Sequence, residues 1–275
     1  MRRALPLVVV VVTCLATALP AIAATAPQNA AALIIGIDLF QGRTRPNIGA
    51  AGDAIDKRDL LIRHGWRADQ IRMLVNEAST QSAIREGLAW LANSCAAPDS
   101  YCLFHYSGHT KQMRGSESLN EFIWPHDNRF ISDDELATYL RRLNGYAWID
   151  IAACEAAGFD NDVSSDRRLF TAASQEPEKG YEYPSWRNSV WTGLLVDEGM
   201  LQGRADTNGD GHVTLSEAIP YAVQRAPDMT KSQPLGAQHP YVAGGNQEVW
   251  FPVPVGGHLS VQTRVRNCIL LILCF

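Results

Sequence analysis

The sequence predicts an α/β domain with a mostly parallel sheet and helices on both faces. Short apolar, β-prone stretches alternate with stretches of helical apolar spacing from residue 33 to residue 224. Parallel strands joined in this way form right-handed crossovers, which place helices on both faces of the sheet. The apolar content of 46% is ordinary for a folded domain, and no repeat or low-complexity segment is present. A single large domain is therefore expected.

Residues 1–23 have the features of a Sec-type signal peptide. Arg2 and Arg3 form a basic start, Leu5–Leu19 is apolar, and Ala21-Ile22-Ala23 offers a cleavage site. Removing this segment takes away two arginines and no acid, so the formal net charge moves from −5 to −7. We expect a secreted or periplasmic protein with no membrane span in the mature chain. An acidic chain also has no electrostatic attraction to nucleic acid.

The first half of the domain contains three predicted strands and two predicted helices. Residues 24–31 are a lead-in without periodicity. The strands are Leu33–Ile37, Ile71–Val75 and the run Cys102–His109. The first helix covers Gly49–His64 and ends before Gly65, and the second starts after the capping residues Ser79-Thr80 and continues through Leu91.

The second half continues the same alternation. A loop or hairpin is followed by a helix capped by Ser132 and running to Leu143, the strand Tyr146–Ala152, the strand Leu169–Ala173, the helix Val190–Leu201 and a last helix Leu215–Gln224. Nothing marks a second domain, so one domain is expected over residues 32–254. The tail 255–275 has no readable pattern. Its apolar run Ile269–Leu273 is far shorter than the roughly 20 residues that cross a bilayer.

Two of these strands lead into reactive side chains. The third ends on the imidazole of His109, and the strand Tyr146–Ala152 leads into the thiol of Cys154. The carboxyl ends of parallel strands meet at one edge of a sheet, and neighbouring strands lie about 4.8 Å apart. Because a thiol needs a nearby base to become a nucleophile, this pairing favours a cysteine peptidase. Alternatively, Cys154 is a small buried hydrophobe. His105 is the competing histidine, but its place inside an apolar strand favours a core role.

The mature chain would carry five cysteines. Cys95 and Cys102 flank a short polar loop and suit a local disulfide, worth roughly 2–3 kcal/mol in the loop-entropy picture. Cys268 and Cys274 are a less well supported second pair. Cys154 is then the odd thiol, which in an exported protein is reactive or available for cross-linking.

Four segments in this order resemble metacaspases and other caspase-fold peptidases. They are Ile48–Ala54, Phe104–His109 with its Tyr-Ser-Gly-His ending, Ile131–Leu136, and Ala153-Cys154-Glu155, the last being closest to the legumain branch. The resemblance runs from about Leu33 to Ala222. It implies that His109 is the general base and acid and that Cys154 is the nucleophile. It also implies that backbone N–H groups of Thr110 and Cys154 form the oxyanion hole.

The expected substrate pocket departs from the family pattern. The family usually has glycine where this chain has Thr110, and an acid or glutamine where it has Ala152. The segment with Trp186 and Arg187 resembles the one with which caspases hold an acidic residue, since a guanidinium suits a carboxylate. The alternative is a surface loop with a solvated arginine. Acidic and basic specificity both remain open.

A twelve-residue segment fits the calcium loop of an EF-hand. Its glycine at position 6 is Gly211, and the expected ligands are Asp206, Asn208, Asp210, the carbonyl of His212, Thr214 and Glu217. A solvated turn is the alternative. A single loop of this kind in an exported protein predicts a weak structural or regulatory Ca²⁺ site, and no organic cofactor is expected.

The leading hypothesis is a secreted cysteine endopeptidase that acts on peptide or protein substrates. The alternative is a catalytically impaired relative, a calcium-stabilised module that binds peptides or proteins, which Thr110 and Ala152 favour. A serine hydrolase using Ser107 is disfavoured because the Gly-x-Ser-x-Gly motif is absent.

Overall fold

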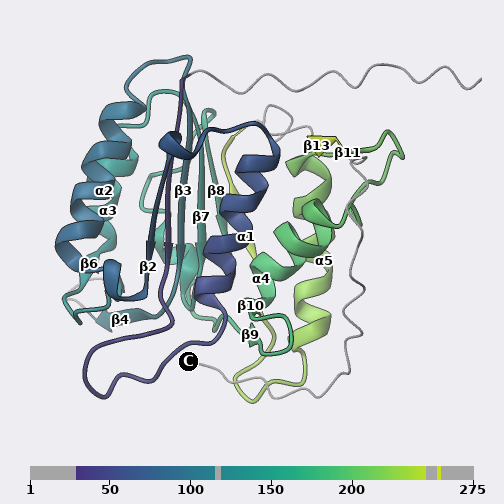
Figure 1. The fold of residues 1–275 in the computed structure, drawn as a ribbon. Coiled ribbons are helices and arrows are strands. Elements are labelled where there is room, and N and C mark those ends of the chain that lie inside the picture. The colour runs from purple at the N-terminus through teal and green to yellow at the C-terminus, as the bar shows by residue number, and fades with distance from the viewer. Residues whose placement is uncertain (1–28, 115–118, 246–252, 255–275) are drawn as a thin grey trace, which may run out of the picture.

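The computed structural model describes residues 29–114, 119–245 and 253–254, and its centre is a six-stranded sheet (Figure 1). The strand order is β12-β8-β7-β3-β1-β2. Their bounds are β1 Ala30–Gly36, β2 Ile71–Val75, β3 Tyr101–Ser107, β7 Tyr146–Ala152, β8 Arg168–Ala172 and β12 Tyr241–Ala243. All neighbours pair in parallel except β12, which is antiparallel to β8 at the edge. The predicted α/β class is confirmed.

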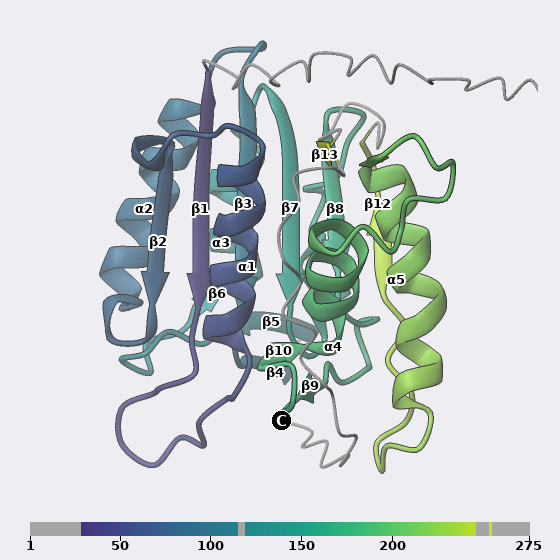
Figure 2. The same cartoon turned by 45° about the vertical axis from the view of Figure 1, so that its right-hand side comes forward.

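Helices cover both faces of this sheet (Figure 2). One face carries α1 Ala50–Arg63, α4 Val190–Thr192 with the π-helical η4 Gly193–Leu201, and α5 Leu215–Thr230; the other carries α2 Gln81–Ser94 and α3 Asp133–Leu140. Successive strand residues point to opposite faces. Ile34 and Trp148 therefore belong to the first apolar core, and Ile35 and Ile149 belong to the second.

Local signals placed the helix starts correctly. The Thr80 hydroxyl accepts a hydrogen bond from the Ala83 N–H at the start of α2, and the Ser132 hydroxyl accepts one from the Glu135 N–H at the start of α3. Helix α3 ends at Leu140, before the predicted Leu143. Helix α5 continues to Thr230, beyond the predicted end at Gln224, since its buried face continues with Ala226. No helix among the described residues combines the length and apolar character needed to cross a membrane.

Two small sheets lie near the carboxyl ends of the strands (Figure 2). A three-stranded sheet consists of β4 Thr110–Arg114, β5 Leu119–Ile123 and β6 Ile131–Ser132. A hairpin joins β9 Glu182–Tyr183 to β10 Asn188–Ser189. The remaining short elements are η1 Ala68–Gln70, η2 Asn76–Ala78, η3 Ala156–Phe159, and the pair β11 His212–Val213 and β13 Val253–Pro254. The sequence predicted a loop or hairpin where the structure has β4–β6, and it predicted none of the other accessory strands.

The predicted disulfide between Cys95 and Cys102 is confirmed. It joins the end of α2 to β3, with a Cα–Cα distance of 6.1 Å. Cys154 is the free cysteine of the described residues. The predicted signal peptide 1–23, the tail 255–275 and the pair Cys268 and Cys274 lie outside the described residues.

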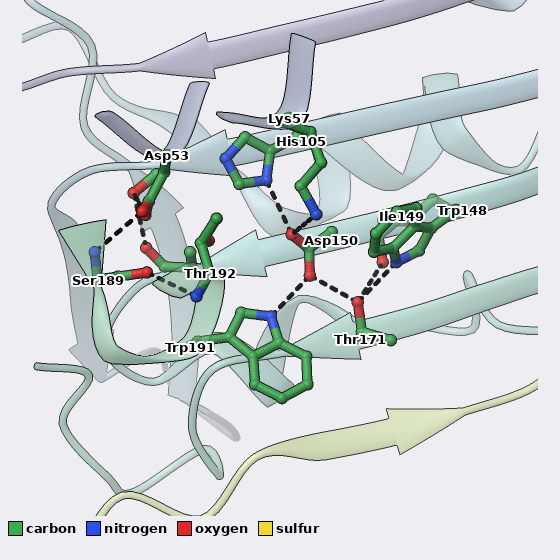
Figure 3. A network of polar contacts seen from close by, with 12 residues as sticks. Asp53, Lys57, His105, Trp148, Ile149, Asp150, Thr171, Ser189, Trp191 and Thr192 are labelled. Atoms are coloured by element: carbon green, nitrogen blue, oxygen red, sulfur yellow. Dashed lines mark hydrogen bonds and ion pairs between the residues drawn. The ribbon is translucent and has the colours of Figure 1, made fainter. Parts of the chain in front are cut away.

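A buried polar network centred on Asp150 lies inside the first core (Figure 3). The Asp150 carboxylate is 2.8 Å from the Lys57 ammonium and 2.8 Å from Nδ1 of His105, and all three side chains are fully buried. Its other oxygen accepts hydrogen bonds from Thr171 at 2.6 Å and Trp191 at 2.8 Å. The network therefore connects β3, β7, β8, α1 and α4.

The network keeps Asp150 ionised. Burial opposes the charge, but Lys57 and His105 outweigh it and hold the pKa of the Asp150 carboxyl below its usual value. Burial lowers the pKa of His105. Because a carboxylate only accepts, Nδ1 of a neutral His105 carries the proton. His105 thus has the core role that its sequence position favoured.

Replacing Asp150 by Asn should lower the free energy of unfolding by about 3–5 kcal/mol, because the buried Lys57 charge loses its counter-ion. Urea unfolding at neutral pH measures the loss. The double variant Lys57→Met/Asp150→Asn should recover part of it. The exposed control Asp228→Asn should change the free energy by less than about 0.5 kcal/mol. Equal stability of Asp150→Asn and the wild type would contradict this account.

Candidate active site

His109 and Cys154 line one pocket at the carboxyl ends of β3 and β7. The register of these parallel strands sets Ser107 opposite Ala152. His109 and Cys154 each come two residues after that pair, so the two segments leave the sheet at the same level. The sequence predicted that the imidazole and the thiol lie at the same edge of the sheet, and both residues line one pocket.

The contact of the His109 ring with Arg45 assigns the ring proton to one nitrogen. Its Nε2 lies 2.7 Å from the backbone carbonyl oxygen of Arg45, and the ring stacks on Phe40 with a centroid distance of 4.8 Å. A carbonyl only accepts, so Nε2 carries the proton and Nδ1 is the acceptor nitrogen. Burial lowers the pKa of His109, which favours the neutral, basic form.

The backbone of His109 is held from the other side. Its carbonyl accepts hydrogen bonds from the Tyr106 hydroxyl and from the Trp124 N–H, the latter at 3.1 Å. Gly108 is required in this turn, because a Cβ there would lie 2.9 Å from the Tyr106 oxygen. The turn between β3 and β4 therefore presents the imidazole in one position.

Cys154 lines the pocket together with Gly180 of the loop formed by residues 174–181. The residue is 8% exposed, and its Sγ lies 3.7 Å from the Gly180 carbonyl oxygen. Gly180 permits this approach, since a Cβ there would come within 2.6 Å of the Ala153 carbonyl oxygen. The next residue, Glu155, has a left-handed backbone with φ of 48°. Cys154 thus lines the pocket with its sulfur against the Gly180 carbonyl.

The expected oxyanion donor at Thr110 lies on the edge strand of the small sheet. Thr110 is opposite Ile123, and the Trp124 N–H bonds to the His109 carbonyl. In an antiparallel ladder this pattern makes Thr110 and Ile123 a non-hydrogen-bonded pair, so the Thr110 N–H points away from β5. The direction is compatible with the predicted role.

Two buried carboxyl groups of the site were not assigned from the sequence. Glu182 lines the pocket and accepts hydrogen bonds from the N–H groups of Gly49 at 2.8 Å and Ile48 at 3.1 Å. Asp53 accepts the Ser107 hydroxyl at 2.7 Å. Burial raises the pKa of Asp53 to about 7 and the pKa of Glu182 to about 8. Asp53 stood in the quoted motif Ile48–Ala54, whereas Glu182 had no signal beyond its charge.

The three predicted pocket residues have different positions. Ala152 lines the pocket together with Cys154. Trp186 packs on Tyr183 with a ring centroid distance of 4.6 Å. Arg187 is exposed, with φ of 59°, between β9 and β10. Neither Trp186 nor Arg187 is among the residues that line the pocket, so this arrangement matches the surface-loop alternative.

The loop 206–217 has the predicted turn but not a gathered set of ligands. Asp206 accepts hydrogen bonds from the N–H groups of Gly209 and Gly211, and Asp210 accepts one from the His212 N–H. The Glu217 carboxylate caps the following helix by accepting from Thr214. Within residues 29–114 and 119–245, no three His, Cys, Asp or Glu side chains are placed to hold a metal ion.

Comparison with known proteins identifies the family. Residues 29–234 match the caspase domain family of peptidases, so the chain belongs to that family. It is 29% identical over 193 residues to metacaspase-1 of Cryptococcus neoformans, covering 65% of this chain and 41% of that protein. It is 28% identical over 203 residues to metacaspase-1 of Arabidopsis thaliana, covering 65% and 54%. The predicted family is confirmed, and the chain spans about half the length of these relatives.

Solved structures show the same fold. Caspase-1 from Spodoptera frugiperda superimposes with a TM-score of 0.53 at 11% identity, covering 80% of this chain and 88% of that one. A protein from Geobacter sulfurreducens has a TM-score of 0.58 at 15% identity, covering 79% and 94%. At these identities the likeness concerns the fold alone.

Stability should fall as pH rises from about 4.5 to about 8 because of Glu182. Its pKa rises from 4.5 to about 8 on folding, so in this window the native state holds a proton that the unfolded state has released. Glu182→Gln should therefore flatten the pH dependence of the urea-derived free energy of unfolding. The control is Glu77→Gln at an exposed position. The same slope in Glu182→Gln and Glu77→Gln would refute this assignment.

Proposed function

We propose that the protein is a secreted cysteine endopeptidase that cleaves peptide bonds with a Cys154–His109 dyad. The observation that carries this proposal is the shared pocket of a histidine and the free cysteine of the described residues at adjacent strand ends. Membership in the caspase domain family supports the peptidase class. Peptides or proteins are the corresponding substrates.

The reaction follows from the two side chains. His109, through Nδ1, takes the proton of the Cys154 thiol, and the thiolate attacks the carbonyl carbon of the scissile bond. Backbone N–H groups of Thr110 and Cys154 would stabilise the oxyanion. His109 then gives its proton to the leaving amine. Water, activated by the same imidazole, hydrolyses the thioester and restores the thiol.

The buried acids favour a basic residue immediately before the cut. Glu182 lines the pocket, and Asp53 lies behind Ser107. Burial raises the pKa of both carboxyls. A bound Lys or Arg side chain would supply the missing positive charge and stabilise the ionised carboxylates. Arg187, which would select an acidic residue, is exposed and outside the pocket lining.

Cleavage of a peptide library should favour Arg and Lys before the cut, and Cys154→Ala and His109→Ala should abolish it. Glu182→Gln should lower kcat/KM for basic peptides about 10- to 100-fold, as expected for a charged hydrogen bond of about 1.5–3 kcal/mol. Glu77→Gln is the control. A preference for Asp or Glu would reject the basic specificity, and Cys154-independent cleavage would reject the dyad.

The alternative is a catalytically impaired member that binds peptides or proteins. The 8% exposure of Cys154 and the contact of its sulfur with Gly180 favour it. Thiol labelling separates the two functions. Labelling of Cys154 that requires His109 supports the enzyme, whereas an unreactive Cys154 in folded protein supports the binding module.

We further propose that the loop 206–217 binds Ca²⁺ for structural stability. Its support is the order of oxygen donors and the positive φ of 82° at Gly211, the sharp turn of this motif. Binding would require the Glu217 carboxylate to turn from Thr214 toward the loop centre. Ca²⁺ would supply the charge that gathers the loop's carboxylates.

Adding 5 mM Ca²⁺, on the order of ten times a weak extracellular Kd, should raise Tm by several degrees over protein in chelator. Asp206→Asn/Glu217→Gln should remove the rise, and Asp228→Asn, at an exposed position on α5, should keep it. An equal Tm with Ca²⁺ and with chelator in the wild type would rule out the site.

A further inference from the structure

The residues that follow His109 and Cys154 are joined by direct side-chain contacts. The Thr110 hydroxyl oxygen lies 2.8 Å from the Cys154 carbonyl oxygen and 3.1 Å from Oε2 of Glu155. A hydroxyl has a single hydrogen, so these two acceptors share it. The contact links the start of β4 to the turn after β7, two segments more than forty residues apart in the sequence.

Glu155 is held on its other oxygen as well. The Lys179 ammonium forms an ion pair with Oε1 of Glu155, and the Glu155 N–H donates to the Glu178 carbonyl at 2.8 Å. Glu155 is only 5% exposed. A carboxylate at that depth requires charged and hydrogen-bonding partners. Thr110 and Lys179 therefore fix both ends of one carboxylate, beside the nucleophile.

The turn that carries Glu155 needs such support. Its φ of 48° places a non-glycine residue in the left-handed region, which costs on the order of 1–2 kcal/mol. This turn sets the position of the Cys154 carbonyl and, through it, of the thiol. On the opposite side, Tyr106 and Trp124 hold the His109 carbonyl. Thr110, next to His109, thus connects a fixed histidine segment to a strained cysteine turn.

We propose that Thr110, Glu155 and Lys179 form a positioning bridge that sets the separation of the His109 imidazole and the Cys154 thiol. The inference rests on the proposed cysteine peptidase function. Without the hydroxyl, the Cys154 carbonyl and the Glu155 turn lose their anchor on β4. The imidazole and thiol then occupy their paired geometry in fewer molecules. In the others, the Cys154 thiolate lacks the neighbouring His109 imidazolium, whose positive charge favours the ionised form of the thiol.

The bridge gives a role to the residue that departs from the family pattern. Glycine, which resembling peptidases usually have at the position of Thr110, has no hydroxyl to donate. With glycine here, the Glu155 carboxylate would keep only Lys179 of its two side-chain partners. The threonine and the glutamate are therefore a matched pair in this chain.

The test is the pH dependence of Cys154 alkylation by iodoacetamide in the full chain, with the modified peptide quantified by mass spectrometry. Thr110→Val removes the hydroxyl and keeps the shape. Its alkylation midpoint should move up by at least half a pH unit, and its rate constant at pH 6.5 should fall about 3- to 10-fold. Thr110→Ser should restore both to within two-fold of the wild type.

Further variants control for folding and for the dyad. Thr138→Val, at an exposed position on α3, should match the wild type. Lys179→Met should shift the midpoint in the same direction as Thr110→Val and serves if that variant is unstable. His109→Ala tests the dyad itself.

Each outcome has one reading. An unshifted midpoint in Thr110→Val and Lys179→Met, with a shifted one in His109→Ala, rejects the bridge and leaves the dyad standing. A lower Tm without a midpoint shift gives Thr110 a merely structural role and also rejects the bridge. An unshifted midpoint in His109→Ala rejects the proposed function and, with it, the bridge.

Discussion

The parallel pairing of β3 with β7 is the constraint on which the candidate active site depends. Ser107 lies opposite Ala152, and both strands end there. A shift of the register by one residue would turn the whole buried set of β7 to the other face of the sheet. The apolar cores on the two faces exclude that shift, because each core contains alternate residues of the strand. The meeting of His109 and Cys154 is therefore a consequence of core packing.

The buried carboxyl groups of this fold have two kinds of partner. Asp150 has a cation, Lys57, within 2.8 Å and stays ionised. Asp53 and Glu182 accept hydrogen bonds from neutral groups, and burial raises their pKa values. The first carboxyl joins elements of the core, and its charge is already balanced. The other two are near the pocket, so a cationic substrate group is the partner that would favour their ionised forms.

Membership in the caspase domain family defines the peptidase class, and the solved structures share the fold. Several individual contacts give this chain its own features. Ala152 lines the pocket without contributing charge. Thr110 places a hydroxyl between the segments that carry His109 and Cys154. The disulfide between Cys95 and Cys102 ties the start of β3 to the end of α2, and β3 leads to His109 at its other end.

Local and periodic features were determined by the sequence alone. The strands, the caps at Thr80 and Ser132 and the disulfide depend on neighbours within a few residues, and the motifs around His109 and Cys154 supplied the candidate catalytic pair. Only the tertiary structure decided the rest. Three hydrogen bonds across long sequence separations are examples. Glu182 accepts one from the N–H at the start of α1, Asp150 accepts one from Lys57, and Glu155 accepts one from Thr110. No local pattern encodes such contacts, because they arise when strand register and helix packing bring distant polar groups together.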